Sequence, residues 1–179
     1  MPAYVSLFRG INVGGHHQIK MAELKALHES LGLKNVLPYI QSGNVVFTSD
    51  DTDVTHLQKQ IEASFEKRFG FHAEVFIRTS ADLSEILQNN PFQGQDNKES
   101  KWTVVMFLAS PPDATAQENL LKTYTGPEEI LFIGKEMYIY YPEGQGRSKL
   151  SGTFIEKKLK TPGTARNLNT VLQLQKMMQ

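Results

Sequence analysis

The spacing of apolar positions in the first half of the chain alternates between a period of two and a helical period. The period of two predicts strands at residues 3–9, 35–40, 44–48 and 73–78. Helical spacing predicts two helices whose apolar stripes are Met21, Leu24, Leu27 and Leu31, then Val54, Leu57, Ile61 and Phe65. Gly32 and Gly70 end these helices. The predicted order, β-α-β-β-α-β, is the split βαβ arrangement of ferredoxin-like domains.

The second half repeats much of this pattern. Ser80, with Asp82 and Glu85 behind it, predicts the start of a short helix, and a polar connection follows over residues 93–100. The remaining elements are a strand at 101–108, a helix from Pro111 to Tyr124, a hairpin of 129–133 and 136–141, a helix capped by Thr153 and Glu156, and a final helix with Thr164 as its N-cap. This half is predicted as β-α-β-β-α-α.

Together the two halves predict an α+β protein of two ferredoxin-like lobes that form an α/β sandwich. We expect the first lobe at residues 1–79, a connecting helix and linker at 80–100, and the second lobe at 101–179.

Composition narrows the class of protein. The chain has 179 residues, of which 40% are hydrophobic and 21% charged, and it contains no cysteine. Disulfides, thiolate metal sites and cysteine nucleophiles are therefore excluded. No apolar run reaches the roughly 18 residues of a membrane-spanning helix, and the first residues resemble a strand more than a signal peptide. We expect a cytoplasmic protein without a membrane partner.

The charges balance overall but are unevenly placed. The 19 basic and 19 acidic residues give zero net charge, which disfavours a protein that wraps nucleic acid. Residues 1–22 contain Arg9 and Lys20 and no carboxylate, whereas residues 144–166 contain six basic residues and only Glu156 as an acid.

The turn from Arg9 to Gly15 is the most site-like feature of the sequence. Its glycines Gly10, Gly14 and Gly15 allow positive φ, and exposed amides before a helix can bind an anion. The spacing matches neither a dinucleotide-binding fingerprint nor a phosphate-binding P-loop. The alternative interpretation is a tight strand-to-helix connection that needs glycine for its geometry alone.

Two further motifs join this turn. Ser42 and Asn44 lie in a predicted hairpin turn, and Arg166 is predicted at a helix N-terminus, where a cation is unfavourable unless an anion or acid lies nearby. We therefore expect one cleft that holds a small phosphate- or carboxylate-bearing ligand. Its predicted residues are Arg9, Asn12, Gly14, Gly15, Lys20, Ser42, Asn44, Arg166 and Asn167.

These motifs resemble a widespread bacterial family. The resemblance rests on Arg-Gly-Ile-Asn-Val-Gly-Gly at 9–15, Gln-Ser-Gly-Asn-Val-Val-Phe at 41–47 and Thr-Ala-Arg-Asn at 164–167. Its members are described only as domains of unknown function. The resemblance implies two ferredoxin-like lobes, and it implies no activity, cofactor or substrate. Leu168 stands where the family often has tryptophan.

Other functions have weaker support. A nucleic-acid-binding module would use the basic segment at 144–166, and a protein-interaction module would use its motifs for folding only. Tyr4, Phe8 and Phe47 could form a base-stacking platform, but we interpret them as core residues. Ser64 and Lys67 lack the companion motifs of penicillin-recognising enzymes, and His16 and His17 lack acidic partners for a metal. The residues predict no metal, cofactor or reaction, and they set no oligomeric state.

Overall fold

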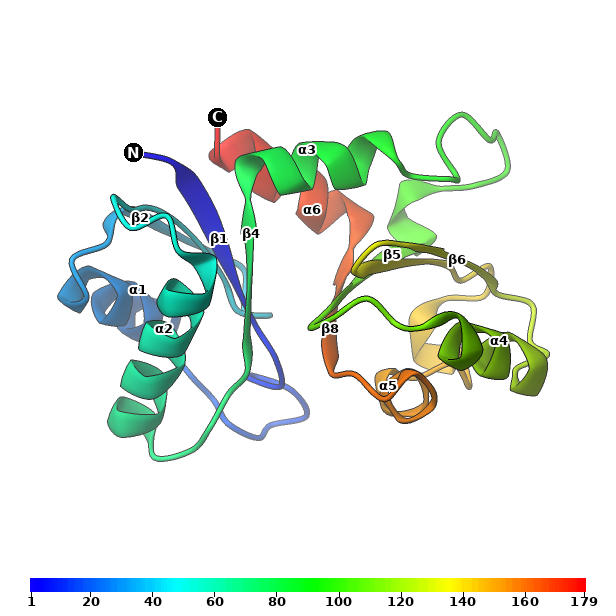
Figure 1. The fold of residues 1–179 in the computed structure, drawn as a ribbon, viewed down its shortest axis with the longest axis horizontal. Coiled ribbons are helices and arrows are strands. Elements are labelled where there is room, and N and C mark those ends of the chain that lie inside the picture. The colour runs from blue at the N-terminus through cyan, green and yellow to red at the C-terminus, as the bar shows by residue number, and fades with distance from the viewer. The chain divides into compact units, whose positions relative to one another are not determined.

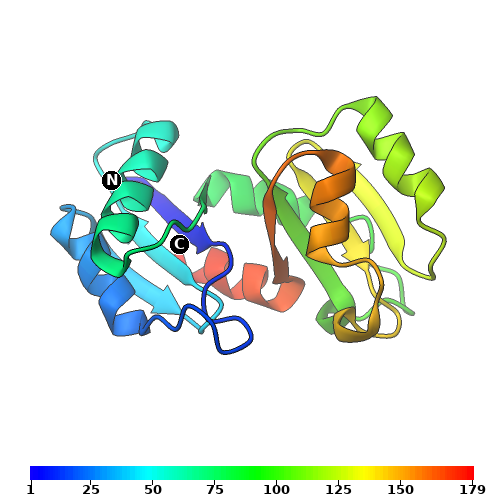
Figure 2. The ribbon, with the colours of Figure 1, turned by 90° about the horizontal axis from the view of Figure 1, so that it is seen from below.

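The computed structural model describes all 179 residues (Figures 1 and 2). The chain forms two compact units, of which the first contains Met1–Ser84 and Gln173–Gln179 and the second Glu85–Leu172. The elements of the first part of the chain are β1 (Ala3–Phe8), α1 (Met21–Ser30), β2 (Lys34–Tyr39), β3 (Asn44–Thr48), α2 (Val54–Phe69), β4 (Val75–Thr79) and α3 (Ser80–Gln88). They are followed by η1 (Ser100–Trp102), β5 (Thr103–Leu108), α4 (Ala114–Thr123), β6 (Glu129–Ile133), β7 (Glu136–Tyr140), η2 (Gln145–Arg147), α5 (Gly152–Leu159), β8 (Gly163–Asn167) and α6 (Leu168–Met177).

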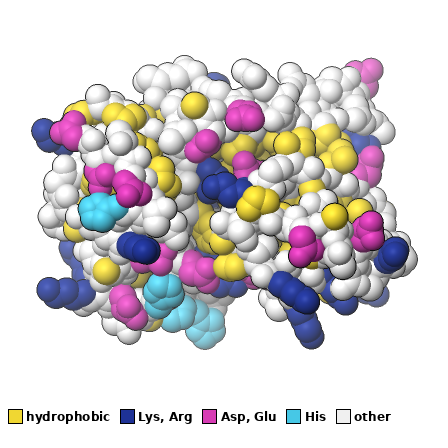
Figure 3. Space-filling view, viewed as in Figure 1, with side chains coloured by type: hydrophobic (Ala, Val, Ile, Leu, Met, Phe, Trp, Pro, Cys, Tyr) yellow, Lys and Arg dark blue, Asp and Glu magenta, His cyan; other side chains and the backbone are white.

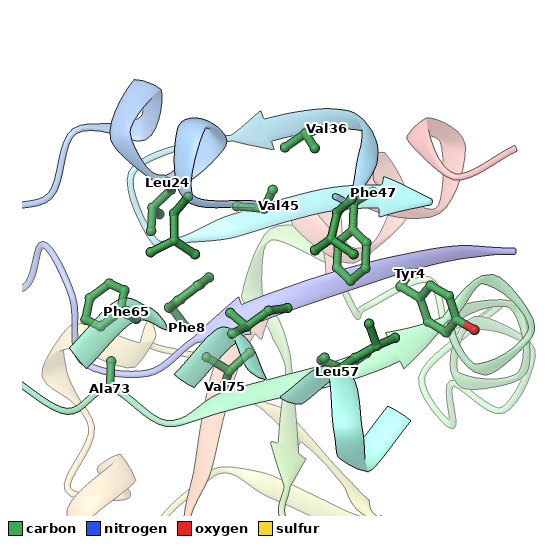
Figure 4. Packing of buried hydrophobic residues seen from close by; sticks show 14 of the residues in the cluster. Tyr4, Phe8, Leu24, Val36, Val45, Phe47, Leu57, Phe65, Ala73 and Val75 are labelled. Carbon is green, nitrogen blue, oxygen red and sulfur yellow. The ribbon is translucent and has the colours of Figure 1, made fainter. Parts of the chain in front are cut away.

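The first unit is built on a four-stranded antiparallel sheet in the order β2-β3-β1-β4. The order of elements along the chain, β-α-β-β-α-β, is the one that the spacing of apolar residues predicts for a ferredoxin-like domain. Figure 4 shows side chains from β1, β3, α1 and α2 pointing toward one another to form the core. Tyr4, Phe8 and Phe47 are buried in it, and the Tyr4 and Phe47 rings stack at 5.6 Å between centroids. The interpretation of these aromatics as core residues is therefore confirmed.

The second unit repeats this topology with a four-stranded sheet in the order β6-β7-β5-β8. Its core combines residues of β5 and β7 with α4 and α5, which lie on one face of the sheet (Figure 2). None of the helices in the chain is long and apolar enough to span a membrane.

Strand β8 corrects one sequence-based prediction. Residues 163–167 were expected to open a helix capped by Thr164, but they pair antiparallel with β5, from Gly163 beside Leu108 to Asn167 beside Val104. A side chain at Gly163 would meet the Phe107 carbonyl oxygen at 2.8 Å, so the glycine permits this close approach of the strands. The strand completes the second βαββαβ unit.

Two helix caps lie one or two residues before their predicted positions. Thr79 and not Ser80 caps α3, because its Oγ1 accepts from the Asp82 amide at 3.0 Å while Asp82 accepts from the Thr79 amide at 2.8 Å. Ser151 and not Thr153 caps α5, since its hydroxyl accepts from the Phe154 amide at 3.2 Å. Both predicted helices exist, and only their first residues differ.

A buried histidine makes the stability of the first unit depend on pH. The Nδ1–H of His28 donates to the Leu24 carbonyl at 2.7 Å, and its Nε2 accepts from the Ser6 hydroxyl at 2.9 Å. Burial lowers the pKa of His28 from 6.5 to about 4, and the bond to the Leu24 carbonyl offsets this only in part. The folded protein therefore holds His28 neutral where the unfolded chain binds a proton.

Because the unfolded chain binds more protons between these two pKa values, we expect the free energy of unfolding to fall as pH drops from about 6.5 to about 4. The contribution of His28 to this loss is about 3 kcal/mol. Urea denaturation across this pH range measures it, and His28→Gln should flatten the profile. Equal profiles for the two proteins would contradict the assignment.

Candidate functional site

The first two sequence motifs meet in the first unit. The loop that follows β1 lies on the turn between β2 and β3, where the Phe8 amide donates to the Gly43 carbonyl at 2.9 Å. Gly43 has φ of 88°, and a side chain there would come within 2.7 Å of the Ile11 Cδ1 atom. Gly43 of the second motif has no side chain, and Ile11 of the first motif therefore packs directly against its backbone.

Asn12 fixes the shape of this loop. Its Nδ2 donates to the Gln41 carbonyl at 2.8 Å, and its Oδ1 accepts from the Ile19 amide at 2.6 Å. Its own backbone amide donates to the His17 carbonyl at 3.1 Å. Asn12 adopts φ of 55°, a left-handed conformation that asparagine tolerates better than most residues. One side chain thus closes the loop and ties it to the hairpin turn.

Four other predicted residues of these motifs, Gly14, Gly15, Ser42 and Asn44, shape the two turns. Gly14 and Gly15 are exposed at the loop tip with φ of 58° and 78°. Asn44 is buried, and its Nδ2 donates to the Tyr39 carbonyl at 3.0 Å and to the Ser42 hydroxyl at 2.9 Å. Ser42 and Asn44 therefore hold the turn together, in agreement with ordinary turn chemistry.

Arg9 has an acidic neighbour that lies far away in the sequence. Its Nη1 is 3.2 Å from Oε1 of Glu74, and the Arg9 amide donates to the Glu74 carbonyl at 3.0 Å. The loop sequence itself contains no acidic residue, but the fold places Glu74 beside it. About 40% of the Arg9 side chain is exposed, so this ion pair sits in a largely aqueous setting.

A hollow of about 600 Å³ lies beside this loop at the start of α1. Lys20 occupies the N-cap position of α1, and no side chain caps the helix there. The Lys20 side chain is exposed and forms no ion pair. The first-turn amides of a helix lack intrahelical partners and carry the positive end of its dipole. The residues that line the hollow are Asn12, Gln18, Ile19, Lys20, Met21, Glu23 and Gln41.

The third motif lies in the second unit and differs from its predicted setting. Arg166 is a buried residue of β8, one residue before the N-cap of α6, so its predicted place beside a helix N-terminus is kept while its backbone belongs to a strand. Its Nη1 donates to the Thr164 hydroxyl at 2.6 Å and to the Ala165 carbonyl at 2.9 Å. Burial lowers the pKa of Arg166 to about 10, which still leaves it charged at neutral pH.

Asn167 ends β8 and begins α6. Its Nδ2 donates to the Lys101 carbonyl at 2.7 Å, and its Oδ1 accepts from the Asn169 amide at 2.9 Å. The second bond is that of a helix N-cap, the role that the sequence assigned to Thr164. The expectation that Arg166 and Asn167 share a cleft with the first two motifs stays a prediction.

Sequence reasoning missed a second buried arginine. Arg78 occupies the same place in β4 that Arg166 occupies in β8, because Arg78 lies beside Val5 of β1 and Arg166 beside Val105 of β5. Both arginines donate from Nη1 to the carbonyl of the preceding residue. The available signal was a lone arginine within the apolar run Val-Phe-Ile-Arg-Thr at 75–79.

A second polar cluster that the sequence did not suggest lies in the second unit. Glu128 accepts from the hydroxyls of Tyr124 and Ser148 at the wall of a hollow of about 540 Å³. Burial alone would raise the pKa of Glu128, but the two hydroxyl donors outweigh it and hold this pKa below its usual range. Burial and the bond to Glu128 raise the pKa of Tyr124. The two donors thus hold the Glu128 carboxylate in place at the wall of this hollow.

No group of three or more His, Asp or Glu side chains is placed to hold a metal ion. The His17 ring lies against Phe71, with 4.0 Å between ring centroids.

Comparisons with known proteins agree with this fold. The family described as "Protein of unknown function (DUF1697)" matches residues 1–138, and the chain belongs to this family. A solved structure, of the conserved bacterial protein SP0830 from Streptococcus pneumoniae, is 27% identical, covers 99% of both chains and has a TM-score of 0.73. No curated protein matches the chain.

The packing of Ile11 on Gly43 can be tested by substituting the glycine. We expect Gly43→Ala to lower the free energy of unfolding by about 3 kcal/mol, because it adds a clash with Ile11 to the strain of a positive φ. Gly10→Ala is the matched control, since Gly10 has φ of 72° and open space around it; it should cost about 1 kcal/mol. Equal costs in urea denaturation would contradict the packing role.

The loop bonds can be tested at Asn12. Asn12→Gly removes the two side-chain bonds and keeps the left-handed backbone favourable, so it should cost about 2 kcal/mol of stability. Asn12→Ala should cost about 1 kcal/mol more, because alanine disfavours that backbone conformation. Urea denaturation compares the two variants, and a neutral Asn12→Gly would show that the bonds contribute nothing.

Proposed function

We propose that this protein binds a small anionic ligand, bearing a phosphate or a carboxylate, in the hollow at the start of α1. The observation that carries this proposal is the uncapped N-terminus of a helix beside Lys20, which has no acidic partner, at the wall of a hollow of about 600 Å³. The helix dipole and the lysine act in the same direction there, so the local potential favours an anion.

The other residues of the hollow suit a polar ligand body. Gln18 and Gln41 can each donate and accept hydrogen bonds, and Glu23 can accept from a hydroxyl or amine. Glu23 lies one turn from Lys20 and repels a second anionic group at its end of the hollow. A ligand with one anionic end and one hydrogen-bond-donating end fits this distribution best.

The loop supports such a site because its shape is fixed before any ligand arrives. Asn12 ties the loop to the Gln41 carbonyl and to the Ile19 amide, and Ile11 is packed on Gly43. A wall that is already ordered loses little conformational entropy when a ligand binds.

A thermal-shift screen against phosphorylated metabolites and nucleotides tests the proposal. A ligand at a hundred times its Kd should stabilise the protein by about 3 kcal/mol. Lys20→Glu should abolish the shift, because it reverses the charge at the helix end. Lys25→Glu, at an exposed site in the same helix, is the matched control and should keep the shift.

Loss of the shift in both variants would indicate a general charge effect and refute the site. A shift with Lys20→Glu as large as with the natural chain would refute it too.

The same screen can distinguish binding of a small ligand from binding of nucleic acid. Figure 3 shows acidic and basic side chains interspersed over the visible face of each unit, without a field of one sign. A basic surface that binds RNA or DNA through phosphates would show affinity that falls steeply with salt. Single-stranded RNA and DNA therefore belong in the screen at low and at physiological salt.

A further inference from the structure

One edge of the second sheet is formed by an apolar and partly exposed strand, β6. Strand β6 pairs only with β7, and its sequence is Glu-Ile-Leu-Phe-Ile, with Leu131 46% and Ile133 39% exposed. Natural proteins blunt such edges with lysine, proline, bulges or covering segments, because an open apolar edge is a template for another strand. β6 contains no lysine or proline, and its one charged residue, Glu129, lies at its first position.

The corresponding edge of the first sheet is protected. Strand β2 carries Lys34 and Pro38, its register shifts between Lys34 and Leu37, and Asn35 has φ of 52°. A proline, a lysine and a bulge together prevent regular pairing along that edge. The two units share a topology, so the difference between their edges is specific to these two strands.

The open backbone groups of β6 can be assigned from its neighbours. The Leu108 amide donates to the Lys135 carbonyl, so residues 135, 137 and 139 direct their backbone groups toward β5. Residues 136, 138 and 140 then face β6, where they pair with residues 133, 131 and 129. The amides and carbonyls of Ile130 and Phe132 therefore point away from the sheet.

We propose that β6 pairs antiparallel with β6 of a second copy of this chain, about a twofold axis at Leu131. In that register Ile130 of one copy lies opposite Phe132 of the other, so the two outward-facing residues of each strand form hydrogen-bonded pairs. Leu131 lies opposite its own equivalent in a non-hydrogen-bonded pair, where side chains approach most closely. The exposed Leu131 and Ile133 side chains of the two copies then cover one another.

Charge complementarity favours this occupant. In the same register Glu129 of one copy lies diagonal to Lys135 of the other, within reach of a long side chain. Lys135 is exposed, and Glu129 already binds Lys98 at 2.5 Å in its own chain. The pairing therefore places each Glu129 between Lys98 of its own chain and Lys135 of the other copy. A strand of five residues buries little surface, so the dimer is weak and exchanges rapidly.

Sedimentation velocity over a concentration series tests the pairing. The natural chain should shift from monomer toward dimer as concentration rises. Leu131→Lys places two lysines opposite each other on the axis and should weaken dimerisation at least about tenfold. Leu37→Lys is the matched control, because Leu37 on the protected edge is 48% exposed; it should leave the dimer unchanged.

A charge reversal tests the register. Lys135→Glu faces Glu129 of the other copy and should weaken the dimer, whereas Lys135→Gln removes the attraction without adding a repulsion and should weaken it less. A protein that stays monomeric at its highest soluble concentration would overturn a second copy as the occupant of this edge. A dimer that survives Leu131→Lys, or one that Leu37→Lys disrupts equally, would overturn the assignment to β6.

Discussion

The packing of the β1–α1 loop on the turn between β2 and β3 is the contact on which the rest of the candidate site depends. Gly43 has no side chain and adopts a positive φ, so Ile11 can lie directly on it. With Ile11 packed there, Asn12 donates a hydrogen bond to the Gln41 carbonyl and accepts one from the Ile19 amide. The loop ends at Lys20, where α1 begins without a side-chain cap. The hollow beside that helix end is a consequence of how the loop is held.

The duplicated topology shows what is special about the first unit. Both units have the same strand order and a buried arginine at the same register position of the last strand, Arg78 or Arg166. They differ in the first connection, which runs over residues 9–20 in the first unit and only 109–113 in the second. The longer connection supplies Asn12, Gln18, Ile19 and Lys20 to the hollow at α1. The units also differ in their edges, since β2 is protected and β6 is open.

Much of the fold could be predicted from apolar spacing, because long helices and buried strands leave a periodic signal. Strand β8 could not, since Gly-Thr-Ala-Arg-Asn has no apolar alternation and its pairing with β5 depends on contacts distant in sequence. The predicted caps at Ser80 and Thr153 were displaced because neighbouring threonine and serine residues offer the same chemistry. The sequence predicted one cleft for all three polar motifs, and the meeting of the first two is one part of that prediction. The approach of Glu74 to Arg9 and the equivalence of Arg78 with Arg166 require the sheet.

The claim that the start of α1 binds an anion can be measured at its own amides. Titration of nitrogen-15-labelled protein with inorganic phosphate should move the amide resonances of Met21 and Ala22 most, in a saturable way. Those shifts should be absent in Lys20→Glu and present in Lys25→Glu. Shifts that centre on Arg147 and Lys149 while Met21 and Ala22 stay still would contradict the account, because they would place the anion in the other unit.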